Sequence, residues 1–410
     1  MALIVQKYGG TSVGSPDRIA RVADRIVATR QGGNDVVVVV SAMGKTTDDL
    51  IDLARQVNPS PPAREMDMLL TAGERISMAL TAMAIEGRGV HAVSFTGSQA
   101  GILTDAAHGS AKIQTIRGTR VQEALAEGKV VIVAGFQGVD PDSREITTLG
   151  RGGSDATAVA LAASLGADVC EIYTDVDGVF TADPRIVPDA RKLAQVAFEE
   201  MLELSAAGAG VLMSRSVEFG RRFNIPIHVR SSFNDTEGTW VQETTMEQAI
   251  ISGIAHDTSE AKLTVRGVPD RPGIAAELFE ALSDRDINID MIVQNTSHDG
   301  STDISLTVPK ASVAIARSVA EQVAAHVQAQ GVEVDDAVGK VSLVGAGMKS
   351  HPGVAAKVFR TLADAGINIE MISTSTIRIS CVMRADHVAD AVKALHAAFN
   401  PPMISEEVGA

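Results

Sequence analysis

Over residues 1 to about 245, short apolar runs alternate with amphipathic stretches. The run 35–41 is almost entirely valine, which is typical of a central strand buried on both faces. Similar runs lie at 129–135, 168–174 and 225–230, and helical patterns lie between the strands, for example at 16–30 and 154–165. This alternation predicts an α/β fold, an αβα sandwich with a mostly parallel sheet. Because ligands of such sheets gather beyond the carboxyl ends of the strands, the segments that follow each strand are the candidates for chemistry.

Beyond a polar stretch at 231–238, the chain contains an internal repeat. Residues 272–292 recur as residues 352–372, at a constant offset of 80 (352 − 272), and each copy joins a Pro-Gly turn to a helical stretch and an Asn-Ile pair. Strand-like runs flank both copies, at 261–267, 303–308, 340–345 and 377–383. This order of elements predicts two ferredoxin-like βαββαβ modules. We therefore expect an N-terminal domain over 1–245, a first module over 246–335 and a second module over 336–410.

Composition excludes several classes of function. The 410 residues carry 36 Lys plus Arg against 51 Asp plus Glu, and a formal charge of −15 argues against non-specific binding to nucleic acid. Cys170 and Cys381 are too far apart in sequence for a CxxC metal site, and two cysteines make no disulfide framework. The N-terminus lacks a signal-peptide pattern, and no apolar run approaches the roughly 18 residues of a membrane helix. We expect a cytoplasmic protein that binds neither nucleic acid nor membrane.

Two glycines follow the first strand-like run. Gly9 and Gly10 let backbone N–H groups approach a phosphate closely, and Lys7 adds a mobile ammonium group that can follow a migrating phosphoryl group. The alternative is a plain strand-to-helix turn with a surface lysine. The same question arises at 71–75, where we expect a helix start: Glu74 is either the partner of a substrate ammonium group or a first-turn carboxylate favoured by the helix dipole.

The segment 147–155 is the most informative one. Arg151 can hold a carboxylate through two hydrogen bonds, and Gly152 and Gly153 lead into a helix that begins near Asp155, which makes a second anion cradle. Ser154 is equally suited to cap that helix. A further segment, 173–185, concentrates Asp, Gly and Pro after a strand and is either a nucleotide site or a series of Asx turns.

Taken together, these segments resemble the amino-acid kinase family. The motifs KYGGTS, SAMG, TAGER, FTGSQAG, TLGRGGSD and TDVDGVFTADPR occur in this order from residue 7 to residue 185. Within the family the chain is similar to the aspartate kinases, most of all to the shorter actinobacterial type, and the C-terminal repeats look like their paired ACT modules. The resemblance covers nearly the whole chain.

The resemblance implies phosphoryl transfer from ATP to the β-carboxylate of L-aspartate, the first step toward lysine, threonine and methionine. The β-carboxylate is already ionised at pH 7, so catalysis needs positioning and charge neutralisation and no general base. The resemblance assigns catalysis to Lys7, Arg151 and Asp155. It assigns aspartate binding to Thr47, Glu74, Arg151, Gly152, Gly153 and Ser154, and ATP binding to Lys7, Tyr8, Gly9, Gly10, Ser41, Thr174, Asp175, Phe180, Arg185, Gly210 and Val211. Mg²⁺ is expected to be held mainly by the ATP oxygens, with no dedicated metal ligands.

One position departs from the family pattern. Members usually carry a lysine near ATP in a Gly-x-Lys stretch, and here the stretch reads Gly-Ala-Gly-Val-Leu over 208–212, which places Gly210 at that position. We expect a raised KM for ATP rather than a lowered kcat, unless the backbone at Gly210 and Val211 replaces the lost contact.

The modules imply control by an amino-acid effector. The resemblance places threonine at Asp270, Gly273, Ile274, Ala275 and Gln294, with Asn368 and Ile369 closing the site. Thr376 stands where relatives inhibited jointly by lysine and threonine carry an acidic residue, so we expect threonine inhibition with weak or no effect of lysine. Module pairing implies a homo-oligomer, at least a dimer, and an internal start near Met246 would yield a small chain of ACT modules. The alternative is that the modules serve assembly only.

Two other functions remain open at this point. An amino-acid sensor with a weakened kinase domain is motivated by Gly210 alone, and Lys7, Glu74, Arg151 and Asp155 argue against it. A kinase of the same fold acting on acetylglutamate, glutamate or UMP is disfavoured by the tandem repeat, because those relatives resemble only the N-terminal part.

Overall fold

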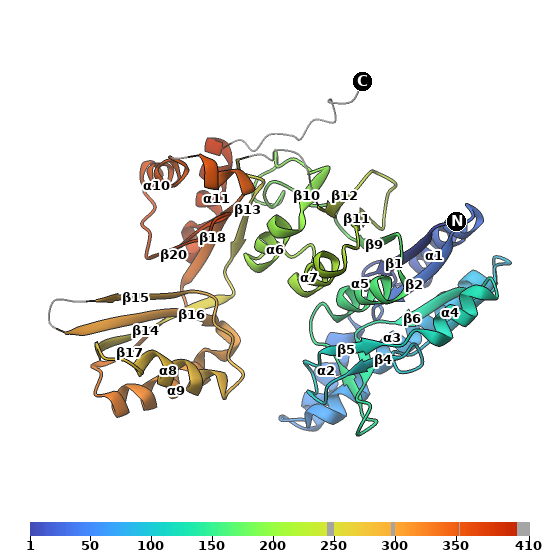
Figure 1. The fold of residues 1–410 in the computed structure, drawn as a ribbon, viewed down its shortest axis with the longest axis horizontal. Helices are drawn as coiled ribbons and strands as arrows, with labels where there is room; N and C mark the ends of the chain where they lie inside the picture. The colour runs from blue at the N-terminus through green and yellow to red at the C-terminus, as the bar shows by residue number, and fades with distance from the viewer. Residues whose placement is uncertain (244–249, 297–299, 352, 400–410) are drawn as a thin grey trace.

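The computed structural model describes residues 1–243, 250–296, 300–351 and 353–399. An N-terminal α/β domain lies on one side of the molecule and two smaller modules lie on the other (Figure 1). The region around Met246 falls outside the described residues.

The N-terminal domain is built on an eight-stranded sheet, as the alternating pattern predicted. All neighbouring strands are parallel except β11 and β12. In spatial order the strands are β10 (Gln195–Ala197), β12 (Thr239–Gln242), β11 (Ile227–Ser231), β9 (Val169–Thr174), β1 (Leu3–Tyr8), β2 (Asp35–Val40), β6 (Val130–Ala134) and β3 (Ala92–Phe95).

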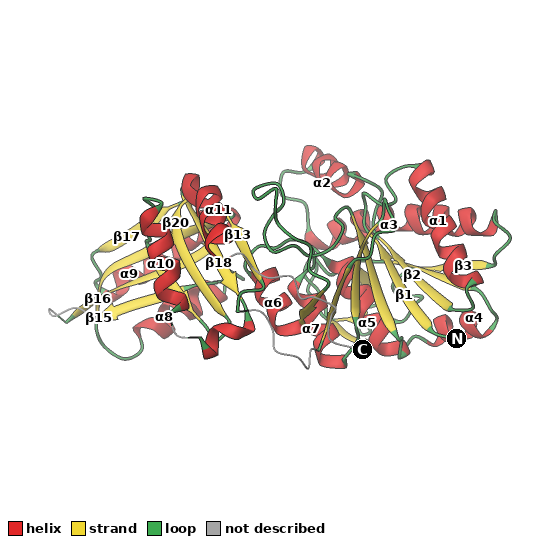
Figure 2. Cartoon of the chain, turned by 90° about the horizontal axis from the view of Figure 1, so that it is seen from above, coloured by secondary structure: helices red, strands yellow, loops and turns green. Residues whose placement is uncertain are grey.

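Helices cover both faces of this sheet (Figure 2). One face holds α1 (Pro16–Gln31) and α3 (Ala63–Glu86), with α2 (Thr46–Val57) packed on α3. The other face holds α4 (Thr119–Ala126), α5 (Gly153–Leu165), α6 (Phe198–Ala206) and α7 (Ser214–Phe223). A second, small sheet in this domain contains β5 (Ile113–Ile116), β4 (Ile102–Thr104), β7 (Gln137–Val139) and β8 (Ile146–Thr148).

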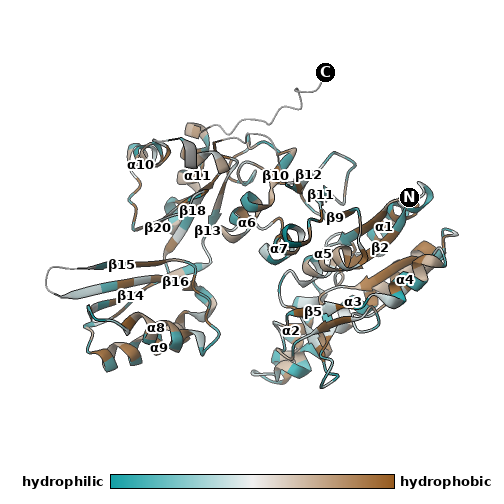
Figure 3. Cartoon of the chain, viewed as in Figure 1, coloured by the Kyte–Doolittle hydropathy of each residue, from teal (hydrophilic) through white to brown (hydrophobic). Residues whose placement is uncertain are grey.

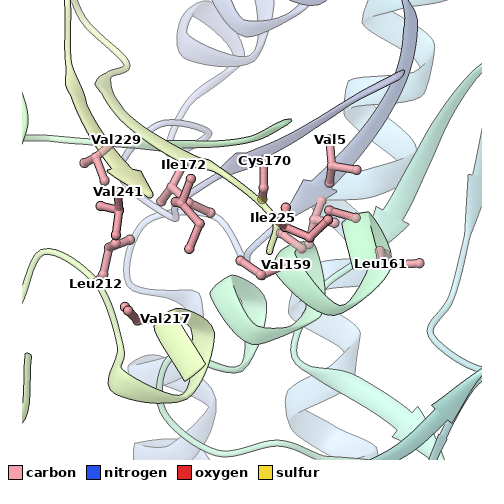
Figure 4. Close-up of a cluster of buried hydrophobic side chains, with 14 of the residues drawn as sticks. Val5, Val159, Leu161, Cys170, Ile172, Leu212, Val217, Ile225, Val229 and Val241 are labelled. Carbon is pink, nitrogen blue, oxygen red and sulfur yellow. The ribbon is translucent and has the colours of Figure 1, made fainter. Parts of the chain in front are cut away.

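The valine run of β2 shows why this strand lies inside the sheet, with helices covering both of its faces. Val37 and Val39 enter the hydrophobic cluster beneath α5 and α7, part of which is drawn in Figure 4, whereas Val36, Val38 and Val40 enter the cluster beneath α1 and α3. All five are fully buried, and hydrophobic colouring follows the strands of the sheet in Figure 3. A strand whose two faces are both covered needs apolar residues at every position rather than at alternate ones.

Helix α3 differs from the expectation drawn from the sequence. We expected a helix start at 71–75, but α3 begins at Ala63, after two prolines, and Glu74 lies near its middle. Gly73 does not end the helix; it allows close packing instead. Its missing side chain lets α3 approach Ala42, since a Cβ on Gly73 would lie 2.7 Å from the Cβ of Ala42. By length and composition α3 is the one described helix that could cross a membrane, but in the structure it packs between α1, α2 and the sheet.

The C-terminal repeats form two α/β modules, each with a four-stranded antiparallel sheet. The first contains β14 (Glu260–Pro269), α8 (Ile274–Ser283), β15 (Ile292–Thr296), β16 (Ser301–Pro309), α9 (Val313–Val327) and β17 (Gly331–Asp335). The second contains β18 (Val338–Val344), α10 (Val354–Asp364), β19 (Met371–Thr374), β20 (Arg378–Arg384), α11 (Val388–Phe399) and β13 (Gly253–Asp257).

Strand β13 differs from the expected linear order. It lies in the span predicted for the first module, yet it pairs with β18 as the edge strand of the second sheet. The first module is therefore inserted between β13 and the rest of the second. The repeat could not reveal this, because β13 precedes both copies and its partner is chosen by a contact between distant residues.

Two ion pairs, each between a lysine of one module and a carboxylate of the other, join the two modules. Lys262 of the first module binds Glu370 of the second, and Lys340 of the second binds Asp290 of the first. Asp290 and Glu370 are equivalent positions of the repeat (370 − 290 = 80). The next equivalent pair, Met291 and Met371, lies in a small apolar cluster between the modules.

The second module also packs against the N-terminal domain. Arg378 of β20 forms an ion pair of 3.0 Å with Glu203 of α6, and Thr181 Oγ1 lies 2.9 Å from His396 Nε2 of α11 in a buried contact. Burial lowers the pKa of His396, which favours the neutral imidazole in this contact.

Candidate active site

A pocket of about 670 Å³ opens at the carboxyl edge of the parallel sheet, where the fold class predicted it. The segments after β1, β2 and β6 border it, together with α2, α3 and the start of α5. It brings together eleven of the residues predicted from the sequence, namely Lys7, Gly9, Gly10, Ser41, Thr47, Glu74, Arg151, Gly152, Gly153, Ser154 and Asp155.

The turn after β1 is held close to two neighbouring strands. Gly9 N donates to the carbonyl of Tyr173 at 3.3 Å, and Gly44 N donates to the carbonyl of Gly10 at 2.9 Å. A Cβ on Gly10 would lie 2.8 Å from the carbonyl oxygen of Ala42, so only glycine fits there. Helix α1 begins only at Pro16, after a cap at Ser15, and its N-terminus does not contribute to the turn itself.

Lys7 and Asp155 form the charged centre of the pocket. Lys7 Nζ lies 2.6 Å from Asp155 Oδ1, and the two side chains are only 12% and 10% exposed. Asp155 lies in the first turn of α5, whose N-terminus favours a carboxylate. This ion pair holds the ammonium group of Lys7 in place at the end of β1 even when no anionic ligand is bound.

Glu74 is a buried carboxylate on the opposite wall. Oε1 accepts a hydrogen bond of 3.1 Å from the backbone N–H of Ala42, and Oε2 has no hydrogen-bond partner among the residues that the structure describes. Burial raises the pKa of Glu74 to about 7. An incoming cation would supply the missing partner of Oε2 and would hold this carboxylate in its ionised form.

Arg151 stands at the rim of the pocket on a turn made by glycines. Gly150 and Gly152 adopt the left-handed backbone conformation, at φ 75° and 70°. Met213 packs against Gly152, where a Cβ would lie 1.9 Å from its side chain. Arg151 is exposed and makes no ion pair within the described residues, so its guanidinium group can meet an anion in the pocket.

The residues predicted to bind ATP divide into two groups. Lys7, Gly9, Gly10 and Ser41 line the pocket. Thr174, which ends β9 beside β1, and Asp175, Phe180 and Arg185, which follow β9, do not line it. Arg185 is engaged by Asp183, with Nη2 2.7 Å from Oδ2, on the exposed surface.

Tyr8, which was predicted to bind ATP, does not line the pocket. Its side chain is fully buried and stacks on Tyr173 with ring centroids 4.7 Å apart, in the layer beneath α1. The contact of Tyr8 with ATP stays a prediction from the sequence.

Gly210 and Val211 lie between α6 and α7, outside the pocket. A Cβ on Gly210 would meet nothing within 4 Å, so the backbone there accepts a side chain at its first atom without a clash. Gly208 is different, because φ is 108° and a Cβ would lie 2.2 Å from the carbonyl oxygen of His256 on β13.

The pocket also contains polar residues that sequence reasoning missed. Asp67 of α3 is fully buried and accepts hydrogen bonds from Gly109 N, from Thr148 Oγ1 at 2.5 Å and, at 2.7 Å, contacts His108 Nδ1. A signal was present in the helical period: Asp67 shares with Leu70 and Glu74 the buried face of α3. A carboxylate buried on the inner face of a helix marks either a functional or a positioning group.

The first module contains a second pocket, of about 370 Å³, at the N-terminus of α8. Its lining includes all five residues predicted from that module, Asp270, Gly273, Ile274, Ala275 and Gln294. Asn368 and Ile369, which were predicted to close the site, lie just before β19 in the second module and line no part of it.

A dedicated metal site was not predicted. Within residues 1–243, 250–296, 300–351 and 353–399, no group of three or more His, Cys, Asp or Glu side chains has the arrangement of a metal site.

Comparison with known proteins connects this geometry to a family. The amino acid kinase family matches residues 2–231, and ACT domains match residues 263–327 and 341–399. Over 405 residues the sequence is 61% identical to an aspartokinase of Mycolicibacterium smegmatis and 60% identical to one of Corynebacterium efficiens, with 97% of this chain and 96% of each relative covered. Among solved structures, E. coli aspartokinase III in complex with aspartate and ADP, in the R-state, superposes with a TM-score of 0.85 at 26% identity, over 97% of this chain and 100% of that one.

Proposed function

Because this chain belongs to the amino acid kinase family and, within it, to the aspartokinases, we propose that it transfers the γ-phosphoryl group of ATP to the β-carboxylate of L-aspartate. The observation that carries the proposal is the pocket itself, in which a buried acceptor for an ammonium group, Glu74, lies across from an unpaired guanidinium group, Arg151. An α-amino acid in zwitterionic form satisfies both.

The remaining charged pair then serves the phosphoryl group. With Glu74 on the substrate ammonium group and Arg151 on the α-carboxylate, the β-carboxylate is directed toward Lys7. One of its oxygens attacks the γ-phosphorus atom while the bond to the oxygen shared with the β-phosphate breaks, and ADP leaves with that electron pair. Lys7 neutralises the charge of the phosphoryl group in transit, and Asp155 fixes Lys7 in position through the 2.6 Å contact.

No base is needed, because the nucleophile is already an anion at neutral pH. The Gly9 N–H is engaged by Tyr173, so the N–H of Gly10 is the backbone donor proposed for the phosphates. Thr174 at the end of β9 and Asp175, Phe180 and Arg185 after it are proposed to hold the nucleoside. Mg²⁺ is proposed to bind through the ATP oxygens, where it would neutralise phosphate charge.

Hydroxylamine trapping tests the reaction. Incubation with Mg-ATP and L-aspartate should yield ADP and aspartyl hydroxamate in equal amounts, since hydroxylamine captures an acyl phosphate. ADP release without hydroxamate would contradict the proposal. Absence of turnover together with saturable binding of an amino acid to the modules would favour a sensor. Acetylglutamate, glutamate and UMP in place of aspartate test the other kinases of this fold.

We propose that Gly210 weakens ATP binding. If the family's lysine contact is what is missing, the variant Gly210→Lys should lower the KM for ATP about three- to tenfold, with kcat changed less than twofold. A Cβ at this position meets no atom within 4 Å, so the substitution begins without a clash. Steady-state kinetics with ATP varied at saturating aspartate measures this. Gly210→Ala is the matched control and should leave the KM unchanged; equal effects of Lys and Ala would assign the change to the backbone.

The pocket of the first module is proposed to take threonine. Its small volume suits a small amino acid, and Asp270 and the N-terminus of α8 offer a partner for each end of a zwitterion. Threonine alone should inhibit, and lysine alone should inhibit weakly or not at all, since Thr376 has no charge to pair with a lysine ammonium group. Titration of each amino acid against activity measures both, and strong inhibition by lysine alone would contradict the assignment.

An oligomer follows from the same pocket. Because Asn368 and Ile369 of the same chain do not reach it, we propose that a second copy supplies them and that the active protein is at least a dimer. The product would enter the synthesis of lysine, threonine and methionine. A separate small chain beginning near Met246 remains a proposal from the sequence.

A further inference from the structure

Asp67 has no role in the mechanism derived above, yet it is the most completely satisfied carboxylate at the pocket. It is fully buried, and donors from two other segments converge on its two oxygens: Gly109 N lies 3.1 Å from Oδ1 and 3.2 Å from Oδ2, Thr148 Oγ1 lies 2.5 Å from Oδ1, and His108 Nδ1 lies 2.7 Å from Oδ2. Burying a carboxylate is costly, so such a group persists where its bonds hold something in place.

The two segments held by Asp67 are those that complete the pocket opposite α3. Thr148 ends β8, and Arg151 follows it by three residues. The loop around Gly109 packs on the same turn: the N–H of Ala111 donates to the carbonyl of Thr148 at 2.9 Å, and a Cβ on Gly150 would lie 3.0 Å from the carbonyl oxygen of Gly109.

Asp67 lies seven residues before Glu74 on the same face of α3, and Glu74 is the proposed partner of the substrate ammonium group. Through Thr148 and Gly109, Asp67 thus connects the helix that carries Glu74 to the turn that carries Arg151. The span between these two groups decides which amino acid fits, because Glu74 takes the ammonium group and Arg151 the α-carboxylate.

We propose that Asp67 is a positioning residue that fixes the distance between Glu74 and Arg151, and so sets the affinity for L-aspartate. The proposal rests on the function proposed above for these two residues. The hydrogen bonds of Asp67 go to His108, Gly109 and Thr148, and not to Lys7 or to the turn of Gly9 and Gly10. Asp67 should therefore affect neither ATP binding nor the chemical step. Its loss should therefore raise the KM for aspartate with little change in kcat, the signature of binding lost equally in ground and transition states.

The variant Asp67→Asn keeps the size of the side chain but removes its charge and one acceptor. We expect the KM for L-aspartate to rise about tenfold or more, with kcat and the KM for ATP changed less than threefold. Thr148→Val, which removes one hydroxyl group and keeps the shape, should raise the KM for aspartate by a smaller factor. In the double variant the second change should add little, because both act on one contact.

Thr81→Val on the same helix is the matched control. Thr81 is equally buried and donates to Ser77 within α3, away from the pocket, so its loss should affect thermal stability without moving the KM for aspartate. If Asp67→Asn raises both KM values by the same factor, or neither, the proposal is overturned. If Asp67→Asn does not fold, Thr148→Val carries the same test.

Hydroxamate formation by the unchanged protein is measured first and separates the two proposals. Its absence would overturn the proposed function, whereas normal turnover with an unaltered aspartate KM in Asp67→Asn would overturn only the positioning role. Calorimetric titration of L-aspartate onto both proteins gives a second readout, and the dissociation constant should rise by the same factor as the KM.

Discussion

Replacing Lys7 by methionine should lower kcat about a thousandfold while the KM for aspartate changes little. Lys7 is the one lysine among the residues that line the pocket, and it is proposed to meet the phosphoryl group. Loss of a single preorganised charge partner costs about 10²- to 10³-fold in reactions of this kind. Rapid-quench measurement of phosphoryl transfer at saturating substrates gives the chemical step directly. A kcat within tenfold of the unchanged protein would remove Lys7 from the proposed chemistry.

The Lys7 variant also leaves Asp155 without its partner. Since both side chains are largely buried, Lys7→Met should lower the melting temperature, and Asp155→Asn in the same background should recover most of that loss without restoring activity. Lys129→Met is the control, because Lys129 forms an exposed pair with Glu127 far from the pocket and should change neither property. The comparison separates the electrostatic role of Lys7 in transfer from its role in the fold.

Glu74 should give the second largest effect, with a dependence on pH. Its pKa in the ligand-free protein is about 7, so below pH 7 the carboxylate is increasingly protonated and loses its attraction for the substrate ammonium group. The KM for aspartate should rise about tenfold for each pH unit below 7 and level off above pH 8. Glu74→Gln should raise the KM about a hundredfold and abolish this pH dependence; a pH profile shared by Glu74→Gln would assign it to another group.

The same burial makes Glu74 costly to the ligand-free fold. A carboxyl group whose pKa rises from 4.5 to about 7 on folding binds its proton more tightly in the folded state, so it destabilises the protein above pH 7 by about 3 kcal/mol and not at all below pH 4.5. Glu74→Gln should therefore melt at a higher temperature than the unchanged protein at pH 8, and the difference should shrink as the pH falls from 7 toward 4.5. At equal concentration, aspartate should stabilise the unchanged protein more than Glu74→Gln, because the variant binds it more weakly.

The αβα sandwich of the N-terminal domain could be predicted from the sequence, because the residue pattern of its strands shows directly which faces are buried. A run such as the valines of β2 fits only a strand covered on both faces, and the carboxyl ends of such strands then locate the glycine turns and Lys7. The predicted residues near Glu74 and Arg151 meet in one pocket for the same reason.

The errors arose where distant contacts override local patterns. Gly73 looks like a helix boundary in sequence, but close packing on Ala42 keeps it inside α3. Asp67 gives no local motif, because its partners lie about 40 and 80 residues away, at Gly109 and Thr148. The burial of Tyr8 depends on Tyr173, which sits on a strand brought alongside by the sheet.

The insertion of one module within the other bears on how the chain is made. As residues leave the ribosome, β13 emerges first and must wait 81 residues (338 − 257) for β18, its partner. The contiguous first module can fold during this interval, and because its β14 packs against β18, its folding shortens the effective loop between the two halves of the second. A fragment beginning at residue 258 would contain the whole first module but would lack β13. Its β18 would then be an unpaired sheet edge, open to pairing with another chain.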